Sequence, residues 1–136
     1  MILVDTSAWV EFDRATRSAV HLRLRELIEQ EAPVAVAEPI VMEVAIGAKS
    51  ERRERELRGL MARFTLLGFD PGVDFDGAAR IYRRCRAAGV TPRGLIDCMI
   101  ASVAQRHRAA LLAHDADLAR IADVMALELD PATLRV

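Results

Sequence analysis

The feature that most constrains the fold of this chain is an alternation of short, branched apolar runs with longer segments of helical periodicity. The apolar runs lie at residues 2–4, 34–37, 65–69, 110–113 and 127–129. Between two of them, Val20, Leu24, Leu27 and Ile28 follow the spacing of one helix face. Strands separated by helices are typical of βαβ units and a parallel sheet. We therefore predict an α/β fold with a central, mainly parallel sheet of about five short strands.

The segments between the apolar runs carry helix signals. The expected helices cover residues 8–12, 19–30, 39–47, 51–64, 75–88, 92–107 and a short stretch that ends near residue 124. Pro39 and Pro92 suit the first turn of a helix, where a backbone N–H is not needed. Gly47 and Gly89 suit helix ends, because glycine adopts the left-handed conformation found there without steric cost. No linker or repeat interrupts the pattern, so we expect one domain over residues 1–136.

Composition excludes several classes of protein. Hydrophobic residues make up 52% of the 136, yet no apolar run reaches the ~18 residues of a membrane helix. The N-terminus lacks a basic signal-peptide region, so we expect a cytoplasmic protein with no membrane partner. A formal net charge of −1 excludes chain-wide attraction for nucleic acid, so local arginines or bound cations would have to hold a polyanion. Cys85 and Cys98 are too few for a disulfide framework or a zinc cluster.

Acidic residues directly follow two of the apolar runs. Asp5 ends the first run, and Asp115 and Asp117 come just after the run at 110–113. The carboxyl ends of parallel strands share one edge of a sheet, and ligands of open α/β folds bind outside that edge. Each of these acids also suits a simpler role as the N-cap of the helix that follows. Position alone leaves both roles open.

Two further acids, Glu43 and Asp97, lie on predicted helices between apolar neighbours. A carboxylate in such surroundings loses hydration unless a cation or a proton compensates for the loss. The simpler alternative for each is an ion pair. Glu43 would reach Lys49 or a more distant arginine, and Asp97 would pair with Arg93 four residues earlier.

These acids are more informative together than one by one. Asp5 and Asp115 at strand ends, with Glu43 and Asp97 on helices that lean over the same edge, would place four carboxylates in one pocket. Like charges in one pocket repel, and divalent cations relieve that repulsion. A set of oxygen ligands favours hard ions such as Mg²⁺ or Mn²⁺ over zinc. The chemistry this predicts is hydrolysis of a phosphodiester by metal-activated water.

Four segments, in this order and spacing, carry a resemblance to a known family. They are Val4-Asp5-Thr6-Ser7-Ala8-Trp9, the helical Glu43 after Glu38-Pro39, Gly94-Leu95-Ile96-Asp97-Cys98-Met99-Ile100-Ala101, and His114-Asp115-Ala116-Asp117-Leu118. Together they resemble a PIN domain and, within that family, a VapC-type ribonuclease toxin of a type II toxin–antitoxin system. The resemblance covers nearly the whole chain. It implies an α/β/α sandwich, a Mg²⁺-dependent endoribonuclease in which Mn²⁺ substitutes, and a small VapB-like antitoxin that blocks the site.

The resemblance also implies roles for particular residues. By the family's pattern, the catalytic acids and metal ligands are Asp5, Glu43, Asp97 and Asp115, with Asp117 as a frequent fifth member. The hydroxyl of Thr6 or of Ser7 would hold an acid or a metal-bound water, and the pattern does not settle which. His114, next to Asp115, is a candidate residue that contacts the metal ligands without binding the metal itself.

One position departs from the family. Leu118 stands where many members carry an aromatic residue, which affects packing more than chemistry. The family's habits also point to a transfer RNA as the substrate and to a homodimer. Apolar helices near Trp9, Val41 and Ile46 are candidates for the surfaces that a partner would cover.

The best local basic patch lies on the helix expected at 75–88. It consists of Arg80, Arg83, Arg84 and Arg86. We expect it to contact RNA phosphates, a contact that carries no sequence information; the alternative is a plain solvated helix face.

The sequence also bears on three rival functions. A phosphatase-like hydrolase is disfavoured because Asp5-Thr6-Ser7 lacks an acid two positions after Asp5. A non-catalytic, receiver-like binding module would need an acidic pair near the first strand, which the sequence does not offer. A PIN-like nuclease that is not a toxin remains open.

Overall fold

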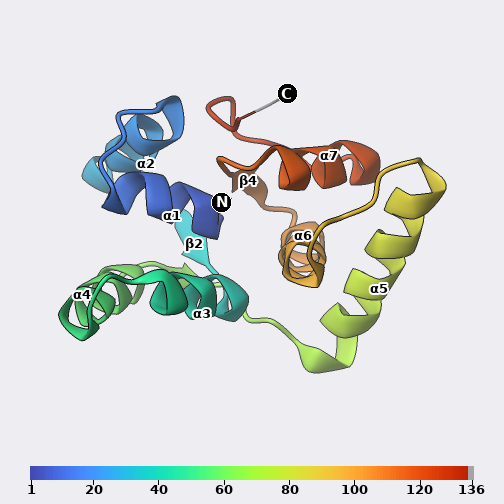
Figure 1. The fold of residues 1–136 in the computed structure, drawn as a ribbon, viewed down its shortest axis with the longest axis horizontal. Helices are drawn as coiled ribbons and strands as arrows, with labels where there is room; N and C mark the ends of the chain where they lie inside the picture. Colours follow the sequence, from blue (N-terminus) through green and yellow to red (C-terminus); the bar gives the residue numbers. More distant parts are fainter. Residues whose placement is uncertain (135–136) are drawn as a thin grey trace.

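The computed structural model describes residues 1–134, which form a parallel sheet flanked by helices (Figure 1). The strands are β1 (Ile2–Val4), β2 (Val34–Val36), β3 (Thr65–Leu66) and β4 (Ala110–Leu112). The helices are α1 (Thr6–Asp13), α2 (Ala19–Glu29), α3 (Glu38–Gly47), α4 (Glu51–Met61), α5 (Pro71–Ala87), α6 (Leu95–His107) and α7 (Ala116–Met125). The strand order is β3-β2-β1-β4, and the pairings between these strands are all parallel. The predicted α/β class is therefore confirmed.

Strand β1 lies at the centre of the sheet, which explains why it is short and wholly apolar. Its Leu3 is fully buried and pairs with Ala35 of β2 on one side and Leu111 of β4 on the other. The N–H of Asp5 donates to the carbonyl of Leu112 at 2.9 Å, which ties the ends of β1 and β4 together. Because the strands are parallel, both ends open at the same edge of the sheet, as the sequence predicts.

The helices form two groups around the sheet. Figure 1 shows α1 to α4, in blue to green, on one side of the molecule and α5 to α7, in yellow to red, on the other. A large apolar core joins the sheet to the first group and to one side of α6 and α7, and a smaller cluster that includes Ile81, Cys85, Cys98 and Ile121 lies among α5, α6 and α7. Among the described residues, no helix has both the length and the apolarity needed to cross a lipid bilayer.

Trp9, the one tryptophan of the chain, is a core residue. Its side chain is 0% exposed, and its ring lies 6.1 Å from that of Phe12 and 6.0 Å from that of Phe64. Trp9 therefore offers no surface to a partner. On α3, by contrast, Ile46 is 77% exposed and Met42 46% exposed, so apolar surface is available there.

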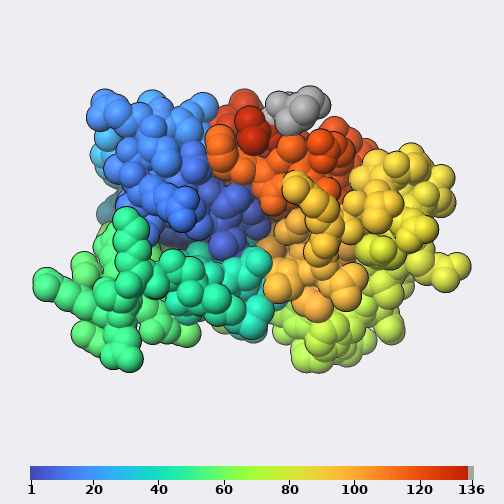
Figure 2. All heavy atoms as spheres, in the orientation of Figure 1, coloured from blue at the N-terminus to red at the C-terminus, as the bar shows by residue number. Residues whose placement is uncertain are grey.

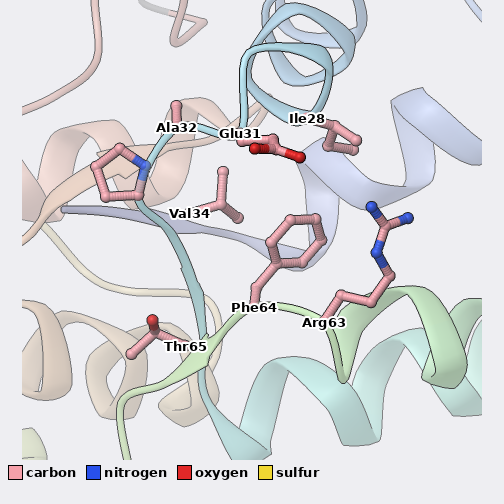
Figure 3. A pocket seen from close by; sticks show the side chains of 8 residues that line it. Ile28, Glu31, Ala32, Val34, Arg63, Phe64 and Thr65 are labelled. Atoms are coloured by element: carbon pink, nitrogen blue, oxygen red, sulfur yellow. The ribbon is translucent and has the colours of Figure 1, made fainter.

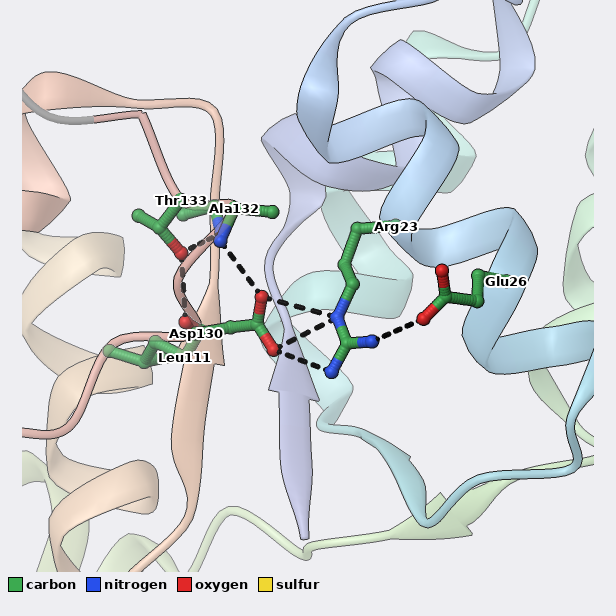
Figure 4. A network of polar contacts seen from close by, with 7 residues as sticks. Arg23, Glu26, Leu111, Asp130, Ala132 and Thr133 are labelled. Carbon is green, nitrogen blue, oxygen red and sulfur yellow. Dashed lines mark hydrogen bonds and ion pairs between the residues drawn. The ribbon is translucent and has the colours of Figure 1, made fainter.

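The strand expected at 127–129 is not formed as a strand. It is reduced to one isolated bridge between Leu111 and Leu129, so the described sheet has four strands rather than five. The ladder does not extend to either side of this bridge, because the N–H of Ala109 donates to the carbonyl of Ala104 and the N–H of Ala113 donates to the Thr133 hydroxyl. Instead, the Asp130 carboxylate accepts from the N–H of Ala132 and from Arg23 of α2 (Figure 4).

The segment after this bridge still follows β4. Thr133 accepts from the N–H of Ala113 at 3.2 Å and donates to the carbonyl of Leu111 at 3.0 Å. Figure 4 shows Thr133 and Asp130 beside Leu111, with Arg23 reaching Asp130 from α2. These contacts hold the end of β4, from which the next acidic residues of the site emerge.

Candidate active site

Asp5 begins α1 at the end of β1 and is 3% exposed. Its Oδ2 accepts from the backbone N–H of Ser7 at 3.0 Å, the ordinary geometry of an N-cap, and also from the Ser7 hydroxyl. Its Oδ1 is buried and has no hydrogen-bond partner within residues 1–134. Capping therefore uses one oxygen of Asp5 and leaves the other available for a second contact, so the N-cap role is observed and the ligand role stays a prediction.

The hydroxyls of Thr6 and Ser7 hold different acids. Ser7 Oγ donates to Asp5 and accepts from the N–H of His114 at 2.8 Å, so it bridges the ends of β1 and β4. Thr6 Oγ1 donates to Glu43 Oε1 of α3 at 2.8 Å. Glu43 is therefore held by Thr6, and the ion pair with Lys49 is not needed to explain its position.

His114 lies beside the acids but its ring turns elsewhere. The imidazole Nε2 lies 3.5 Å from Glu11 Oε1 on α1. Its contribution to the site comes from the backbone, through the N–H that it donates to Ser7. The supporting role expected for the His114 side chain stays a prediction.

Asp115 begins α7 as Asp5 begins α1. Its Oδ1 accepts from the N–H groups of Asp117 at 2.8 Å and Leu118 at 3.4 Å, which caps the helix. Leu118 is 0% exposed and packs in the large core, as its apolar character predicts. The two strand-end acids are thus placed by the same local device at the same edge of the sheet.

A pocket of about 660 Å³ brings four of the predicted acids together. It is lined by Glu43, Arg93, Gly94, Leu95, Ile96, Asp97, Asp115 and Asp117. These residues come from α3, the start of α6 and the start of α7, with Asp5 at the end of the adjoining strand. Figure 2 shows the blue start of the chain, the teal of α3 and the orange of α6 meeting on one face of the molecule.

The electrostatics of this pocket disfavour ionisation of its acids. Burial, opposed in part by the hydrogen bonds from Ser7, raises the pKa of Asp5 to about 6, and Glu43 and Asp115 add repulsion. Burial raises the pKa of Asp97 to about 7, with further repulsion from Asp5, Asp115 and the other acids. At neutral pH some of these carboxylates are ionised and repel one another, and a bound cation would neutralise that repulsion.

The residues present fit a divalent cation. The donor set is made of carboxylate oxygens, which Mg²⁺ and Mn²⁺ prefer, and Asp5 keeps one buried oxygen without a partner. Across residues 1–134, however, no three acids, histidines or cysteines already stand in a ready ligand arrangement. Binding an ion would therefore require these carboxylates to turn toward it, a change that side-chain rotation can supply.

Arg93 lines the acid pocket and contacts Asp117 rather than Asp97. Its backbone N–H donates to Asp117 Oδ2 at 3.0 Å, and its guanidinium Nε lies 3.9 Å from Asp117 Oδ1. The ion pair with Asp97, which was the simpler alternative for that acid, is not formed in the structure. The helix expected from residue 92 begins only at Leu95, with Gly94 as its N-cap. A sequence signal for this long-range contact does not exist, since it joins residues 24 positions apart.

The predicted RNA-contact patch lies apart from the acid pocket. Arg80, Arg83, Arg84 and Arg86 are exposed on α5. None of them is among the residues that line the acid pocket. Their contact with RNA stays a prediction.

A second pocket lies at the opposite edge of the sheet, where β2 and β3 begin. It measures about 350 Å³, and Figure 3 shows Ile28, Val34 and Phe64 around it with Glu31 and Arg63 nearby. Its charged residues are of opposite sign, and no cluster of acids lies there. The contrast leaves the carboxyl edge as the candidate site.

A parallel α/β sheet with clustered carboxylates at its carboxyl edge defines a class of hydrolase-like sites, and comparisons with known proteins specify the family. The profile of the PIN domain matches residues 2–124. Ribonuclease VapC11 of Mycobacterium tuberculosis is 43% identical over 129 residues, which cover 94% of this chain and 96% of that protein.

Solved structures agree with this match. The VapBC2 complex of Rickettsia felis, bound to a DNA fragment from its promoter, has a TM-score of 0.73 at 20% identity and covers 96% of this chain and 98% of that one. VapC20 of M. tuberculosis, described as a sarcin–ricin loop cleaving toxin, has a TM-score of 0.67 at 16% identity and covers 88% and 93%. At these identities the structures show a shared fold. The chain belongs to the PIN-domain family, among the VapC ribonucleases.

Proposed function

We propose that this chain is a divalent-metal-dependent endoribonuclease that acts as the toxin of a toxin–antitoxin pair. The observation that carries the proposal is the pocket of clustered carboxylates beside the buried, unpartnered Oδ1 of Asp5. The 43% sequence identity of this chain to a VapC ribonuclease also supports the proposal. We expect Mg²⁺ as the cofactor, with Mn²⁺ as a substitute.

The acids of the pocket would hold the ion, and the hydroxyls beside them would hold the acids. The proposed ligands are Asp5, Glu43, Asp97 and Asp115, with Asp117 at the margin. When bound, a divalent ion supplies Lewis acidity, which activates water and neutralises charge that develops on phosphate oxygens. Ser7 orients Asp5, and Thr6 orients Glu43, through the hydrogen bonds described above.

The proposed substrate is a folded RNA that is cut at an exposed loop, with transfer RNA as the first class to test. A chain of net charge −1 has few means to coat nucleic acid indiscriminately. Loop nucleotides present an unstacked backbone that a concave site can reach. The description of VapC20 as a loop-cleaving toxin supports the same choice.

The proposed partners are a VapB-like antitoxin and a second copy of the chain. The neighbouring structures that contain VapBC complexes support the first. Exposed apolar side chains on α3 and α5, among them Ile46 and Phe75, supply surface that either contact would cover.

One assay tests the proposal. The purified chain is incubated with total RNA, which contains both transfer and messenger RNA, in Mn²⁺ or in EDTA, and the cleaved ends are sequenced. We expect Mn²⁺-dependent cuts at one or a few loop positions, absent in EDTA. Asp97→Asn should lose at least ~1,000-fold in kcat/KM. Loss of a residue that only hydrogen-bonds to a metal ligand already reduces activity about 10–100-fold, and loss of a ligand should reduce it further.

The matched control is Asp123→Asn, an exposed acid on α7 outside the pocket. It should cleave like the wild type. Full activity in Asp97→Asn, or cleavage that EDTA does not change, would overturn the proposed site. Cuts spread evenly over messenger RNA would overturn the proposed substrate.

A further inference from the structure

Arg93 stands out among the residues that line the acid pocket, because it is the basic side chain among them. The other charged residues of that lining, within the described part of the chain, are Glu43, Asp97, Asp115 and Asp117. A phosphate that approaches this pocket meets negative charge on most sides. Arg93 is placed where a phosphate group needs a counter-charge.

The guanidinium of Arg93 is held loosely. Its side chain is 77% exposed, and its Nε lies 3.9 Å from Asp117 Oδ1, at the limit of an ion pair. At this distance, and with the guanidinium largely in water, the attraction between Arg93 and Asp117 is weak, so a phosphate group competes with it readily. The side chain is therefore free to change partner.

The backbone of Arg93, by contrast, is held firmly. Its N–H donates to Asp117 Oδ2 at 3.0 Å, and Asp117 is 4% exposed at the start of α7. This bond anchors the backbone of Arg93 at the rim of the pocket, while its guanidinium stays exposed to solvent. Asp117 does not lose its charge compensation when the tip leaves, because Arg120 Nη1 lies 3.8 Å from the same Oδ1.

We propose that the Arg93 guanidinium binds a phosphate of the RNA beside the acid pocket, with Asp117 as the residue that positions it. This inference rests on the proposed ribonuclease function. Arginine suits the task because its planar fork matches two phosphate oxygens at once. In this arrangement the carboxylates bind the metal ion and Arg93 binds the adjacent RNA phosphate. A substitution of Arg93 can therefore weaken RNA binding without changing metal binding.

The test compares Arg93→Ala with Arg25→Ala. Arg25 is a matched control, since its side chain is 50% exposed and its Nε lies 3.9 Å from Glu29 Oε1 on α2, outside the pocket. For each variant, kcat/KM is measured on a transfer RNA over a range of KCl concentrations. Mn²⁺ affinity is measured by calorimetry without RNA.

We expect Arg93→Ala to lose roughly tenfold in kcat/KM, mostly through KM, and its logarithmic salt slope to shrink by about 1, as for one lost phosphate contact. Mn²⁺ affinity should stay unchanged. Arg93→Lys should recover part of the loss, because it keeps the charge without the fork. Arg25→Ala should match the wild type.

Two outcomes would overturn the assignment. One is an Arg93→Ala variant with the kinetics and salt slope of Arg25→Ala. The other is a parallel loss of Mn²⁺ affinity, which would place Arg93 in support of the metal ligands instead. Absence of any cleavage by the wild type would overturn the proposed function itself. Affinity for a fluorescent RNA hairpin, measured in the Asp97→Asn background, then still decides whether Arg93 contacts phosphate.

Discussion

Asp5 and Asp74 are both buried carboxylates, and the protein treats them in opposite ways. Asp74 on α5 is 0% exposed, and both of its oxygens are bonded. Oδ1 accepts from Ser102 at 2.8 Å and from Arg106 Nε at 3.2 Å, while Oδ2 accepts from Arg106 Nη2 at 2.7 Å and from the N–H of Asp70 at 2.8 Å. Asp5, by contrast, has one oxygen, Oδ1, without a hydrogen-bond partner in the described part of the chain.

The pKa values follow this difference. Burial alone would raise the pKa of Asp74, but the hydrogen bonds from Arg106, Asp70 and Ser102 lower it below its ordinary value. Burial raises the pKa of Asp5 to about 6, and its bonds with Ser7 only reduce the rise. A buried acid that joins two helices, Asp74, thus has hydrogen-bond partners for both of its oxygens. At the carboxyl edge of the sheet, Asp5 lacks a partner for one oxygen among the described residues, which is typical of a ligand-binding site.

The largest expected effect tests the satisfied member of the pair. Asp74→Ala should lower the free energy of unfolding by about 3 kcal/mol, because it leaves Arg106 and Ser102 without their partner between α5 and α6. Urea unfolding followed by circular dichroism measures the change. The control is Asp76→Ala, an exposed acid on the same helix, which should stay near the wild type. A neutral Asp74→Ala would show that the bonded acid is no more structural than the unbonded one.

The next effect concerns the unsatisfied acids and depends on pH. Folding raises the pKa of Asp97 from 3.8 to about 7, so the folded chain holds this proton more tightly than the unfolded chain. The stability that protonation confers is complete below about pH 4 and is lost as pH rises through 7. Asparagine suffers no such loss.

Asp97→Asn should therefore be more stable than the wild type at pH 8 without divalent ions, by about 2 kcal/mol. This is roughly half of the full shift at 1.4 kcal/mol per unit, since coupled acids share protons. Near pH 4 the two proteins should unfold alike. Denaturant titrations at both pH values measure the gain, with Asp123→Asn as the exposed control. A variant that is less stable at pH 8 would contradict the account of the pocket as a strained cluster.

The smallest expected effect is the stabilisation of the folded chain by Mn²⁺, which should differ between variants of Asp5 and of Asp74. Mn²⁺ at about ten times its Kd should stabilise the wild type by about 1.4 kcal/mol, because it binds the folded chain alone. Asp5→Asn should lose this response. Asp74→Asn should keep it, since the Asp74 oxygens are already occupied by Ser102, Arg106 and Asp70. Melting curves with and without Mn²⁺ measure the difference. Equal responses in both variants would remove the distinction between the two carboxylates.

Most of the fold was predictable because its signals are local. Strand β1 ends where Asp5 begins a helix, and branched apolar runs and capping residues mark such boundaries within a few positions. The errors lie at the boundaries of elements. At 127–129 the ladder is limited to one bridge, because the N–H groups of Ala109 and Ala113 donate to Ala104 and Thr133 instead, and α6 begins at Leu95 rather than at residue 92.

For this protein, the sequence alone determined the alternation of strands and helices, the parallel class of the sheet and the acids that follow the strands. Those features depend on periodicity and on neighbours within one or two turns. Only the tertiary structure decided that Thr6 holds Glu43 while Ser7 holds Asp5, that Asp74 is satisfied while Asp5 is not, and that Arg93 turns to Asp117. Such choices depend on which side chains meet across tens of positions in the chain, and the free energies that separate the alternatives are set by burial and geometry rather than by local pattern.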